Sequence, residues 1–183
     1  MSAVYGAIEA GGTKFVLSAA NSPGELNRFQ IQTTTPEETL GQVVTYFRAN
    51  PVDALGLACF GPVDLAQGVI TETPKLAWRN FPIVAYLQDA LGIPVTLDTD
   101  VNAAALGEQA FGAAQGIASF VYFTVGTGIG GAAIIDGHLL HGAMHAEMGH
   151  IPVRRHSGDG FRGVCPSHQD CLEGMAAGPA ITA

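Results

Sequence analysis

Positive charge is scarce in this sequence. Lys and Arg together number 8 among 183 residues, Asp and Glu number 16, and the formal net charge is −8 with His counted as neutral. Nucleic acids and anionic lipid surfaces are bound by clustered cations, and the chain contains no basic run. We therefore expect neither a nucleic-acid partner nor a membrane partner. A small anionic ligand would have to be bound by local donors such as backbone N–H groups.

Cysteine is also rare, and the N-terminus carries no mark of export. The three cysteines are Cys59, Cys165 and Cys171, an odd number that favours reduced thiols over a disulfide framework. Residues 1–10 lack the basic start of a signal peptide and include Glu9. We therefore expect a cytoplasmic protein.

Charge is absent altogether from residues 109–135, a stretch long enough for a membrane-spanning helix. Five glycines between residues 116 and 131, flanked by β-branched and aromatic residues, favour a β-hairpin instead. We predict a strand at 119–125, a glycine-rich turn at 126–131 and a returning strand at 132–135. The turn has two interpretations: a row of backbone N–H groups that holds a phosphate, or a tight connection between two core strands.

The same pattern occurs near the N-terminus, where a predicted strand at residues 4–9 is followed by small residues at 10–13 and a strand at 14–20. Two copies indicate two similar halves, residues 1–118 and 119–183, each of which offers a phosphate loop to a shared cleft. The second half is much shorter than the first. It is therefore expected to be an incomplete second lobe.

The remaining pattern predicts an α/β protein with a packed core, because 48 % of the residues are hydrophobic and 13 % are charged. One predicted helix has a clear start, with Thr35 as N-cap, Pro36 at the first position and Glu38 closing a capping box. The other expected elements are helices at 82–91 and 103–110 and strands at 28–32, 54–60, 69–71 and 95–97.

Two single residues invite competing interpretations. Cys59, in the predicted strand 54–60, is better explained as a small core residue than as a functional thiol. Trp78 is the only tryptophan and follows a Thr-Pro-Lys loop. It fits a core anchor and one wall of a ligand pocket equally well.

Asp98 and Asp100 lie at the carboxyl end of a predicted strand, directly before a predicted helix. Open α/β sheets bind ligands at this place. A carboxylate there can accept a proton from a substrate hydroxyl or hold a cation. The alternative is helix capping, which Asp also favours. Capping explains one aspartate well but not two, so Asp100 is the candidate base.

A second group of candidate residues lies near the end of the chain. Cys165, His168 and Cys171 follow one another at three-residue spacing in a loop rich in Gly and Pro. Because zinc prefers four nitrogen or sulfur ligands, we predict a structural Cys2His2 zinc site with His150 or His156 as the fourth ligand. The alternative is a solvent loop with incidental Cys and His. The other histidines lack cysteine neighbours and are expected in exposed loops: His138, His141 and His145.

Two glutamates flank this predicted metal loop. Glu147 comes three residues before His150, and Glu173 comes two residues after Cys171. A rigid metal loop would hold both carboxylates at fixed positions, where they could accept hydrogen bonds from sugar hydroxyls. Their other interpretation is ordinary surface charge or charge in the first turn of a helix.

Taken together, these stretches resemble the ROK family of sugar kinases, which has the two-lobe actin-like ATPase (ribonuclease H-like) fold. The bacterial zinc-containing fructokinases are the most similar branch, since they share the Asp-Thr-Asp form and the Cys-Pro-x-His-x-x-Cys loop, where many relatives have a third cysteine at the place of His168. The resemblance rests on four motifs in the family's order, at residues 9–14, 98–103, 126–131 and 147–174.

The resemblance implies a role for each matching residue. Asp100 would be the general base that takes the proton from the terminal hydroxyl of a hexose, with D-fructose favoured, and the oxygen would attack the γ-phosphate of Mg-ATP. Phosphate binding is implied for Gly11, Gly12, Thr13, Lys14, Gly126, Thr127 and Gly128. Substrate binding is implied for Asn102, Glu147, His150 and Glu173. Zinc ligation is implied for His150, Cys165, His168 and Cys171, which favours His150 over His156.

Three alternatives stay open. The first is a glucose or mannose kinase of the same family. The second is a non-catalytic sugar-binding regulator, which ranks low because family regulators begin with a DNA-binding segment whereas a strand begins here at Val4. The third is a zinc-stabilised interaction module without enzymatic activity. The resemblance leaves homodimer formation open. Because family members continue beyond residue 183, we expect this chain by itself to be a weak kinase or inactive.

Overall fold

The computed structural model describes residues 2–25, 27–142 and 146–183, so His145 lies outside the described part. The chain divides into two compact units, Met1–Ala103 and Ala104–Ala183. The boundary falls inside helix α3 (Asp100–Phe111). The sequence-based division at residue 118 stays a prediction about the domains.

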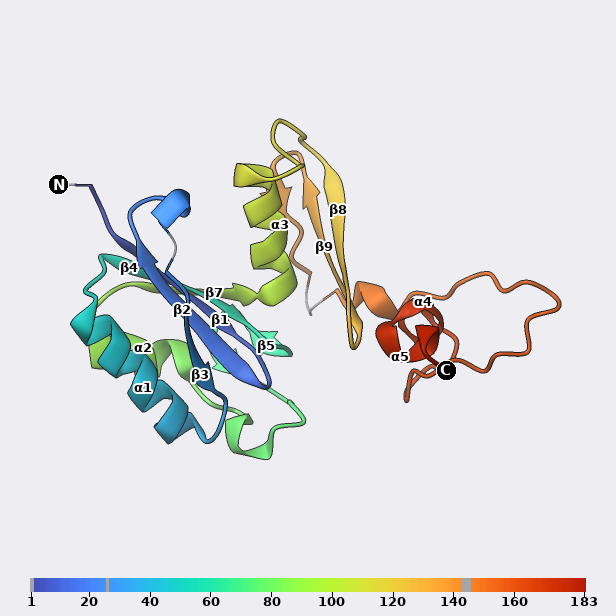
Figure 1. The fold of residues 1–183 in the computed structure, drawn as a ribbon, viewed down its shortest axis with the longest axis horizontal. Coiled ribbons are helices and arrows are strands. Elements are labelled where there is room, and N and C mark those ends of the chain that lie inside the picture. The colour runs from blue at the N-terminus through green and yellow to red at the C-terminus, as the bar shows by residue number, and fades with distance from the viewer. Residues whose placement is uncertain (1, 26, 143–145) are drawn as a thin grey trace. The chain divides into compact units, whose positions relative to one another are not determined.

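Unit 1 is built on a five-stranded mixed sheet in the order β3-β2-β1-β4-β7 (Figure 1). The first three strands in sequence form an antiparallel meander, and β4 and β7 join β1 in parallel. This arrangement confirms the α/β expectation. The strands are β1 (Tyr5–Ala10), β2 (Lys14–Ala20), β3 (Phe29–Gln32), β4 (Ala54–Cys59) and β7 (Val95–Thr99).

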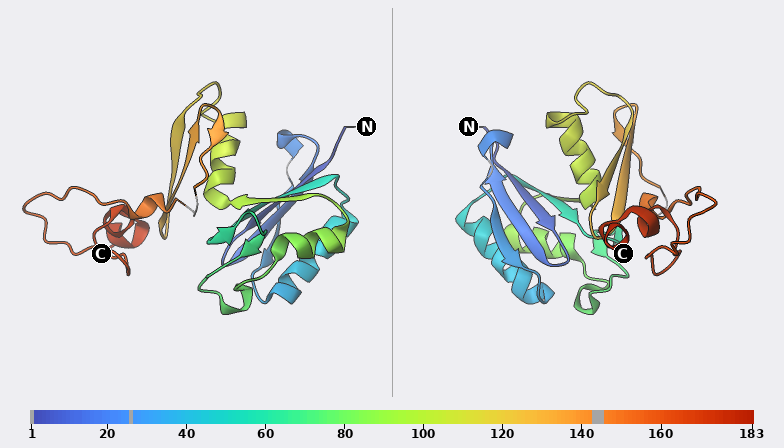
Figure 2. Two further views of the ribbon diagram at one scale, coloured as in Figure 1. Left: turned by 180° about the vertical axis from the view of Figure 1, so that it is seen from behind. Right: turned by 45° about the vertical axis from the view of Figure 1, so that its right-hand side comes forward.

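Helices α1 (Pro36–Ala49) and α2 (Ile83–Leu91) lie side by side on one face of this sheet, as both views agree (Figures 1 and 2). Alternate strand residues such as Ile8, Leu57 and Leu97 point into the core that they share with both helices. The predicted cap of α1 is confirmed, since Thr35 Oγ1 accepts a hydrogen bond of 3.3 Å from the Glu38 amide. The smaller elements of unit 1 are η1 (Pro23–Glu25), β5 (Val63–Asp64), β6 (Val69–Ile70) and η2 (Leu76–Trp78).

Unit 2 contains a three-stranded antiparallel sheet in the order β10-β9-β8. Like unit 1, it contains a hairpin closed by a glycine-rich turn, so both predicted hairpins are confirmed, whereas the division into two similar halves stays a prediction. Figure 2 shows the long orange to red loop that connects η3 to α4. The elements are β8 (Phe120–Val125), β9 (Ile129–Ile135), β10 (His138–Leu139), η3 (Met148–His150), α4 (Leu172–Ala176) and α5 (Gly178–Ile181).

The uncharged stretch before Asp136 therefore contains the end of α3 and then the predicted hairpin. No helix in the described ranges combines the length and the apolar composition that crossing a bilayer requires. Three local predictions were wrong. The strand predicted at 95–97 continues to Thr99. The following helix begins at Asp100 instead of residue 103. The glycine turn predicted at 126–131 ends at Gly128, because Ile129 already belongs to β9. His138 is exposed as expected, but it lies in β10.

Candidate active site and metal centre

Three parallel strands of unit 1 end in register, at Ala10, Cys59 and Thr99. Gly11 and Asp100 directly follow the outer two of these strands. Since neighbouring strands are about 4.8 Å apart, the backbones of these two residues are about 10 Å apart. The carboxyl edge of the sheet thus brings a glycine turn and an aspartate within the length of one small ligand, which is the placement expected for open α/β sheets.

The two aspartates at this edge have different surroundings. Asp98 Oδ1 accepts hydrogen bonds from the Thr99 amide at 2.8 Å and from Asn102 Nδ2 at 2.6 Å. Helix α3 is capped by Thr99, whose Oγ1 accepts from the Asn102 amide at 3.2 Å. Thr99 is therefore the N-cap, so neither aspartate occupies that position. Asp98 instead holds the side chain of the buried Asn102.

Asp100 is exposed, and its Oδ1 accepts a bond of 2.9 Å from the Val101 amide. Its charge acts on Cys59 at the end of the neighbouring strand: burial first and the Asp100 carboxylate second raise the pKa of the Cys59 thiol to about 12. Cys59 is fully buried in the unit 1 core, which confirms its interpretation as a core residue. An exposed carboxylate at this edge can accept a proton from a ligand hydroxyl.

The first glycine turn is closed by a bond of 2.9 Å from the Gly11 amide to Lys14 O. Thr33, the residue after β3, fixes the turn, because its hydroxyl donates to Gly11 O at 2.7 Å and its amide to Thr13 O at 3.0 Å. A Cβ on Gly11 would come within 2.7 Å of Lys14 O, so the turn requires glycine there. Its conformation is therefore set by tertiary contacts as well as by sequence.

Lys75 is a cation beside this turn that sequence reasoning missed. A Cβ built on Gly12 would lie 3.4 Å from Lys75 Cε. The loop that carries Lys75 is anchored by Trp78, which is 1 % exposed and donates from Nε1 to Thr34 O at 2.8 Å. Trp78 is thus a core anchor and not a pocket wall. The sequence offered one signal for this lysine, the Pro-Lys pair shortly before the tryptophan. A lysine on a loop that is anchored by a buried side chain has a defined position.

The second glycine turn, in unit 2, is shorter than predicted. The Gly126 amide donates to Gly128 O at 2.9 Å, and β8 and β9 pair from Val125 opposite Ile129 onward. Gly131 lies in the strand, where a Cβ would come within 2.7 Å of Met148 Cβ. That glycine serves the packing of η3 on β9, whereas the first two glycines form the turn itself.

The predicted sugar-binding glutamates differ in their contacts. Glu173, at the start of α4, accepts a hydrogen bond of 2.9 Å from the Ile129 amide through Oε2. Glu147 is exposed, and its Oε2 lies 3.9 Å from His150 Nε2. The contact of Glu173 with the glycine turn spans 44 residues, and no local pattern in the sequence indicates it.

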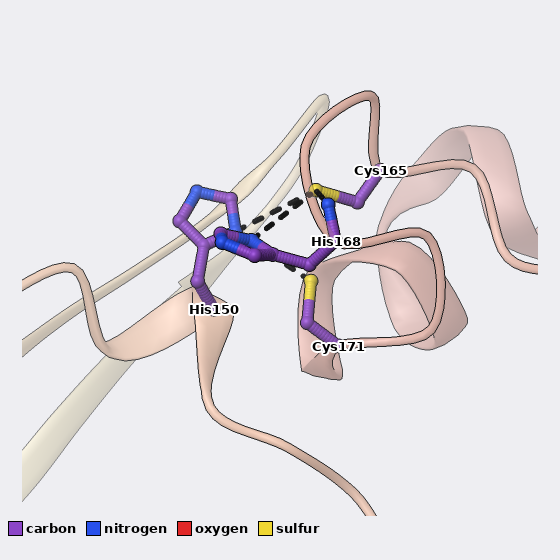
Figure 3. A group of neighbouring side chains, drawn as sticks. All are labelled: His150, Cys165, His168 and Cys171. Carbon is purple, nitrogen blue, oxygen red and sulfur yellow. Dashed lines mark hydrogen bonds between the residues drawn. The ribbon is translucent and has the colours of Figure 1, made fainter.

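Four side chains of unit 2 converge on one point: His150, Cys165, His168 and Cys171 (Figure 3). Their ligand atoms all lie within 4.8 Å of one another. Cys165 Sγ is 3.7 Å from His150 Nδ1 and 3.9 Å from His168 Nδ1, and Cys171 Sγ is 3.5 Å from His150 Nδ1. The edges of a zinc tetrahedron with such ligands measure about 3.3–3.8 Å. The donor set and its spacing therefore fit a tetrahedral metal.

Backbone amides support both sulfur atoms, since the His168 amide donates to Cys165 Sγ and the Gly174 amide to Cys171 Sγ, each at 3.4 Å. The first of these bonds lowers the pKa of the Cys165 thiol, whereas burial raises that of Cys171. His156, the other candidate for the fourth ligand, is not in the group, and its Nδ1 accepts from the Gly158 amide at 3.2 Å.

Arg155 braces the loop between these ligands. Its guanidinium lies 3.4 Å from Asp159 Oδ2 and 3.5 Å from Asp170 Oδ2, and it also donates to the backbone oxygens of Asp159 and Phe161. Asp170 directly precedes Cys171, so Arg155 connects the far part of the loop to a ligand. Sequence reasoning did not single it out.

Comparisons with known proteins place this geometry in a family. The sequence profile of the ROK family matches residues 5–183. The chain belongs to the ROK family. A fructokinase of Lactococcus lactis subsp. cremoris is 49 % identical over 190 residues, covering 100 % of this chain and 64 % of the relative. A fructokinase of Zymomonas mobilis is 46 % identical over 191 residues, covering 97 % and 64 %. A Streptomyces coelicolor glucokinase is 32 % identical, covering 95 % and 56 %.

Solved structures agree with this ROK membership. The ROK hexokinase of Thermus thermophilus is 34 % identical with a TM-score of 0.79, covering 97 % of this chain and 61 % of that one. The ROK glucokinase of Streptomyces griseus, in complex with glucose and AMPPNP, is 31 % identical with a TM-score of 0.78, covering 97 % and 58 %. The predicted actin-like ATPase fold is thus confirmed. The chain spans less than two thirds of the length of these relatives.

Proposed function

We propose that this ROK protein catalyses the ATP-dependent phosphorylation of a hexose, with D-fructose as the substrate. The observation that carries the proposal is the exposed carboxylate of Asp100 at the same strand edge as the Gly11 turn. D-fructose is chosen over glucose because fructokinases share 46–49 % of the sequence, against 32 % for a glucokinase. The product is fructose 6-phosphate.

In this reaction Asp100 is the general base. Its carboxylate accepts the proton of the terminal sugar hydroxyl as that oxygen attacks the γ-phosphorus of Mg-ATP. A new bond forms between the sugar oxygen and phosphorus, and the bond between the γ-phosphorus and the bridging oxygen breaks and releases ADP. The protein contributes mostly by positioning and charge stabilisation, because the chemistry of phosphoryl transfer needs little else.

The proposed phosphate ligands are backbone amides of the two glycine turns other than those of Gly11 and Gly126, which donate within their own turns. Gly11 and Gly126 would instead let a phosphate approach the backbone closely, because they lack a side chain. Binding by amides suits a chain with few cations. Lys75 supplies a positive charge beside Gly12, and its anchored loop limits the entropy cost of holding that charge in place. The proposed phosphate-binding residues are Gly11, Gly12, Thr13, Lys14, Lys75, Gly126, Thr127 and Gly128.

Sugar hydroxyls are the proposed ligands of Asn102, Glu147, His150 and Glu173. The amide of Asn102 is oriented by Asp98 at 2.6 Å, so its position is fixed before a substrate binds. Zinc is the proposed metal of the Cys/His cluster, held by His150, Cys165, His168 and Cys171, and its chemistry there is structural. The carboxylate of Glu147 near the other ring nitrogen of His150 is the type of partner that orients a metal-bound imidazole.

A coupled assay of ADP release against a hexose panel tests the substrate. The native full-length protein is expected to show its highest kcat/KM with D-fructose and lower values with glucose and mannose. A preference for glucose or mannose would contradict the fructose assignment, and binding of a hexose without ADP release would identify a sugar-binding regulator instead. The homodimer and the cytoplasmic location stay predictions, which light scattering and cell fractionation would test.

A further inference from the structure

The segment that carries the proposed metal ligands is hydrogen-bonded to the end of the second glycine turn through Glu173. Glu173 is the second residue of α4 and follows the ligand Cys171 by two positions, and its Oε2 accepts from the Ile129 amide at 2.9 Å. Ile129 is the first residue after the turn Gly126–Gly128. A carboxylate bond to a backbone amide is about twice as strong as a bond between neutral groups. The turn is therefore tied at its end to the metal loop.

Two further contacts join the same parts of unit 2. The Gly178 amide, at the start of α5, donates to Gly126 O at 2.7 Å. Gly149 of η3 lies so close to β9 that a Cβ on it would come within 1.8 Å of Ile129 O. Because η3 also carries the ligand His150, segments before and after the metal loop contact Ile129 at one end of the turn, and α5 contacts Gly126 at the other end.

The position of Glu173 depends on the metal ligand Cys171, which caps the helix that carries Glu173. Cys171 is the N-cap of α4, and its Sγ accepts from the Gly174 amide at 3.4 Å. Fixing that sulfur by a metal fixes the first turn of α4, and Glu173 lies in this turn. With only five residues, α4 cannot hold its own conformation without such support.

We propose that Glu173 is a positioning residue that couples the metal centre to the conformation of the second glycine turn. Gly126 and Thr127 are exposed, and the glycines at both ends of the turn give it a high conformational entropy when it is not held. The bond from Ile129 limits this freedom and keeps the turn amides in one arrangement for an anion. This role rests on the proposed metal site and the proposed phosphate turn. It differs from sugar binding, because the carboxylate here accepts from the Ile129 amide and not from a sugar hydroxyl.

Hydrogen exchange of the zinc-loaded native protein tests this coupling without relying on activity. In Glu173→Ala, the amide of Ile129 is expected to exchange on the order of 10- to 100-fold faster, as loss of a hydrogen bond to a charged acceptor implies. Glu173→Gln keeps an acceptor oxygen and is expected to retain most of the protection. Asp136→Asn is the matched control, because it removes an exposed carboxylate of unit 2 that belongs neither to the metal cluster nor to the glycine turn. Amides of β1 and β4 verify that unit 1 stays folded.

Metal analysis of the same samples separates the possible outcomes. Removing zinc from the wild type is expected to raise exchange of Ile129 as Glu173→Ala does. If Glu173→Ala holds zinc and Ile129 exchanges as in the wild type, the coupling is wrong. The same conclusion follows if Glu173→Gln is as impaired as Glu173→Ala. If the wild type holds no zinc, the proposed metal centre is wrong, and the Ala and Gln pair still decides whether Glu173 orders the turn.

Discussion

Asp98 and Asp100 illustrate how two neighbouring carboxylates acquire different functions. The carboxylate of Asp98 is held by Thr99 and Asn102, whereas Asp100 faces solvent at the end of the parallel strands. From the sequence alone, each aspartate could be either a helix cap or a carboxylate that acts on a ligand. Only the hydrogen bonds separate them, because the side chain of Thr99 takes the capping role that either aspartate could have had.

Lys75 is expected to contribute to phosphate binding. Replacing it by Met keeps the aliphatic stem over Gly12 and removes the charge, so the Kd for ADP should rise about tenfold. The rise should shrink at high ionic strength, because salt screens partly exposed charges. Isothermal titration calorimetry at two salt concentrations measures both effects. Arg28→Met, which removes an exposed cation elsewhere in unit 1, is the control and should leave the Kd unchanged. An unchanged Kd in Lys75→Met would show that this lysine is not a phosphate ligand.

The three cysteines are expected to differ in reactivity. With zinc bound, an aromatic disulfide reagent at pH 8 should find no reactive thiol, since Cys59 has a pKa of about 12 and the other two would be metal ligands. A chelator should release two reactive thiols, Cys165 and Cys171. The third should react only after denaturation, because burial keeps Cys59 protonated and inaccessible. Reaction of all three thiols in the folded protein would contradict this assignment.

At the scale of secondary structure, most elements follow from local signals. The Thr-Pro-Glu-Glu start defines α1, and Gly92, with φ of 69°, ends α2 as a left-handed C-cap. The start of α3 was misplaced because the Asp98 and Thr99 bonds that fix it involve side chains within a strand-helix junction. Long-range contacts such as Glu173 with Ile129, and the placement of Lys75 at Gly12, arise from tertiary packing and have no periodic signature.

The metal loop depends on Arg155 for its order. Arg155→Met removes partly buried ion pairs and two bonds to backbone oxygens, so zinc affinity should fall about tenfold or more, as loss of outer partners of a metal site does. Competition with a chromophoric zinc chelator measures this change. Arg154→Met is the matched control, since Arg154 is exposed and adjacent. Equal zinc affinities of the two variants would show that Arg155 does not support the site.

At the scale of the whole molecule, the two units have different sources of stability. The large apolar core cluster belongs to unit 1, whereas the metal ligands all belong to unit 2. Structural zinc contributes directly to folding free energy where the apolar core is small. The units are therefore expected to respond differently to loss of the metal.

Zinc removal should loosen unit 2 and leave unit 1 folded. Trp78 is the only tryptophan and is buried in unit 1, so its fluorescence should keep its emission maximum after chelation. Hydrogen exchange in residues 146–181 should increase under the same conditions. A red shift of the Trp78 emission on chelation would contradict the independence of the unit 1 core from the metal.

The central claim concerns the carboxylate at the end of β7. The most direct test is the single-turnover rate of phosphoryl transfer from ATP to fructose in the native full-length protein and in Asp100→Asn. The variant should lose 10²- to 10⁴-fold in rate with unchanged ADP affinity, as expected for removal of a general base. Asp89→Asn, an exposed change on α2, should keep the wild-type rate. A rate in Asp100→Asn within a few-fold of the wild type would contradict the account.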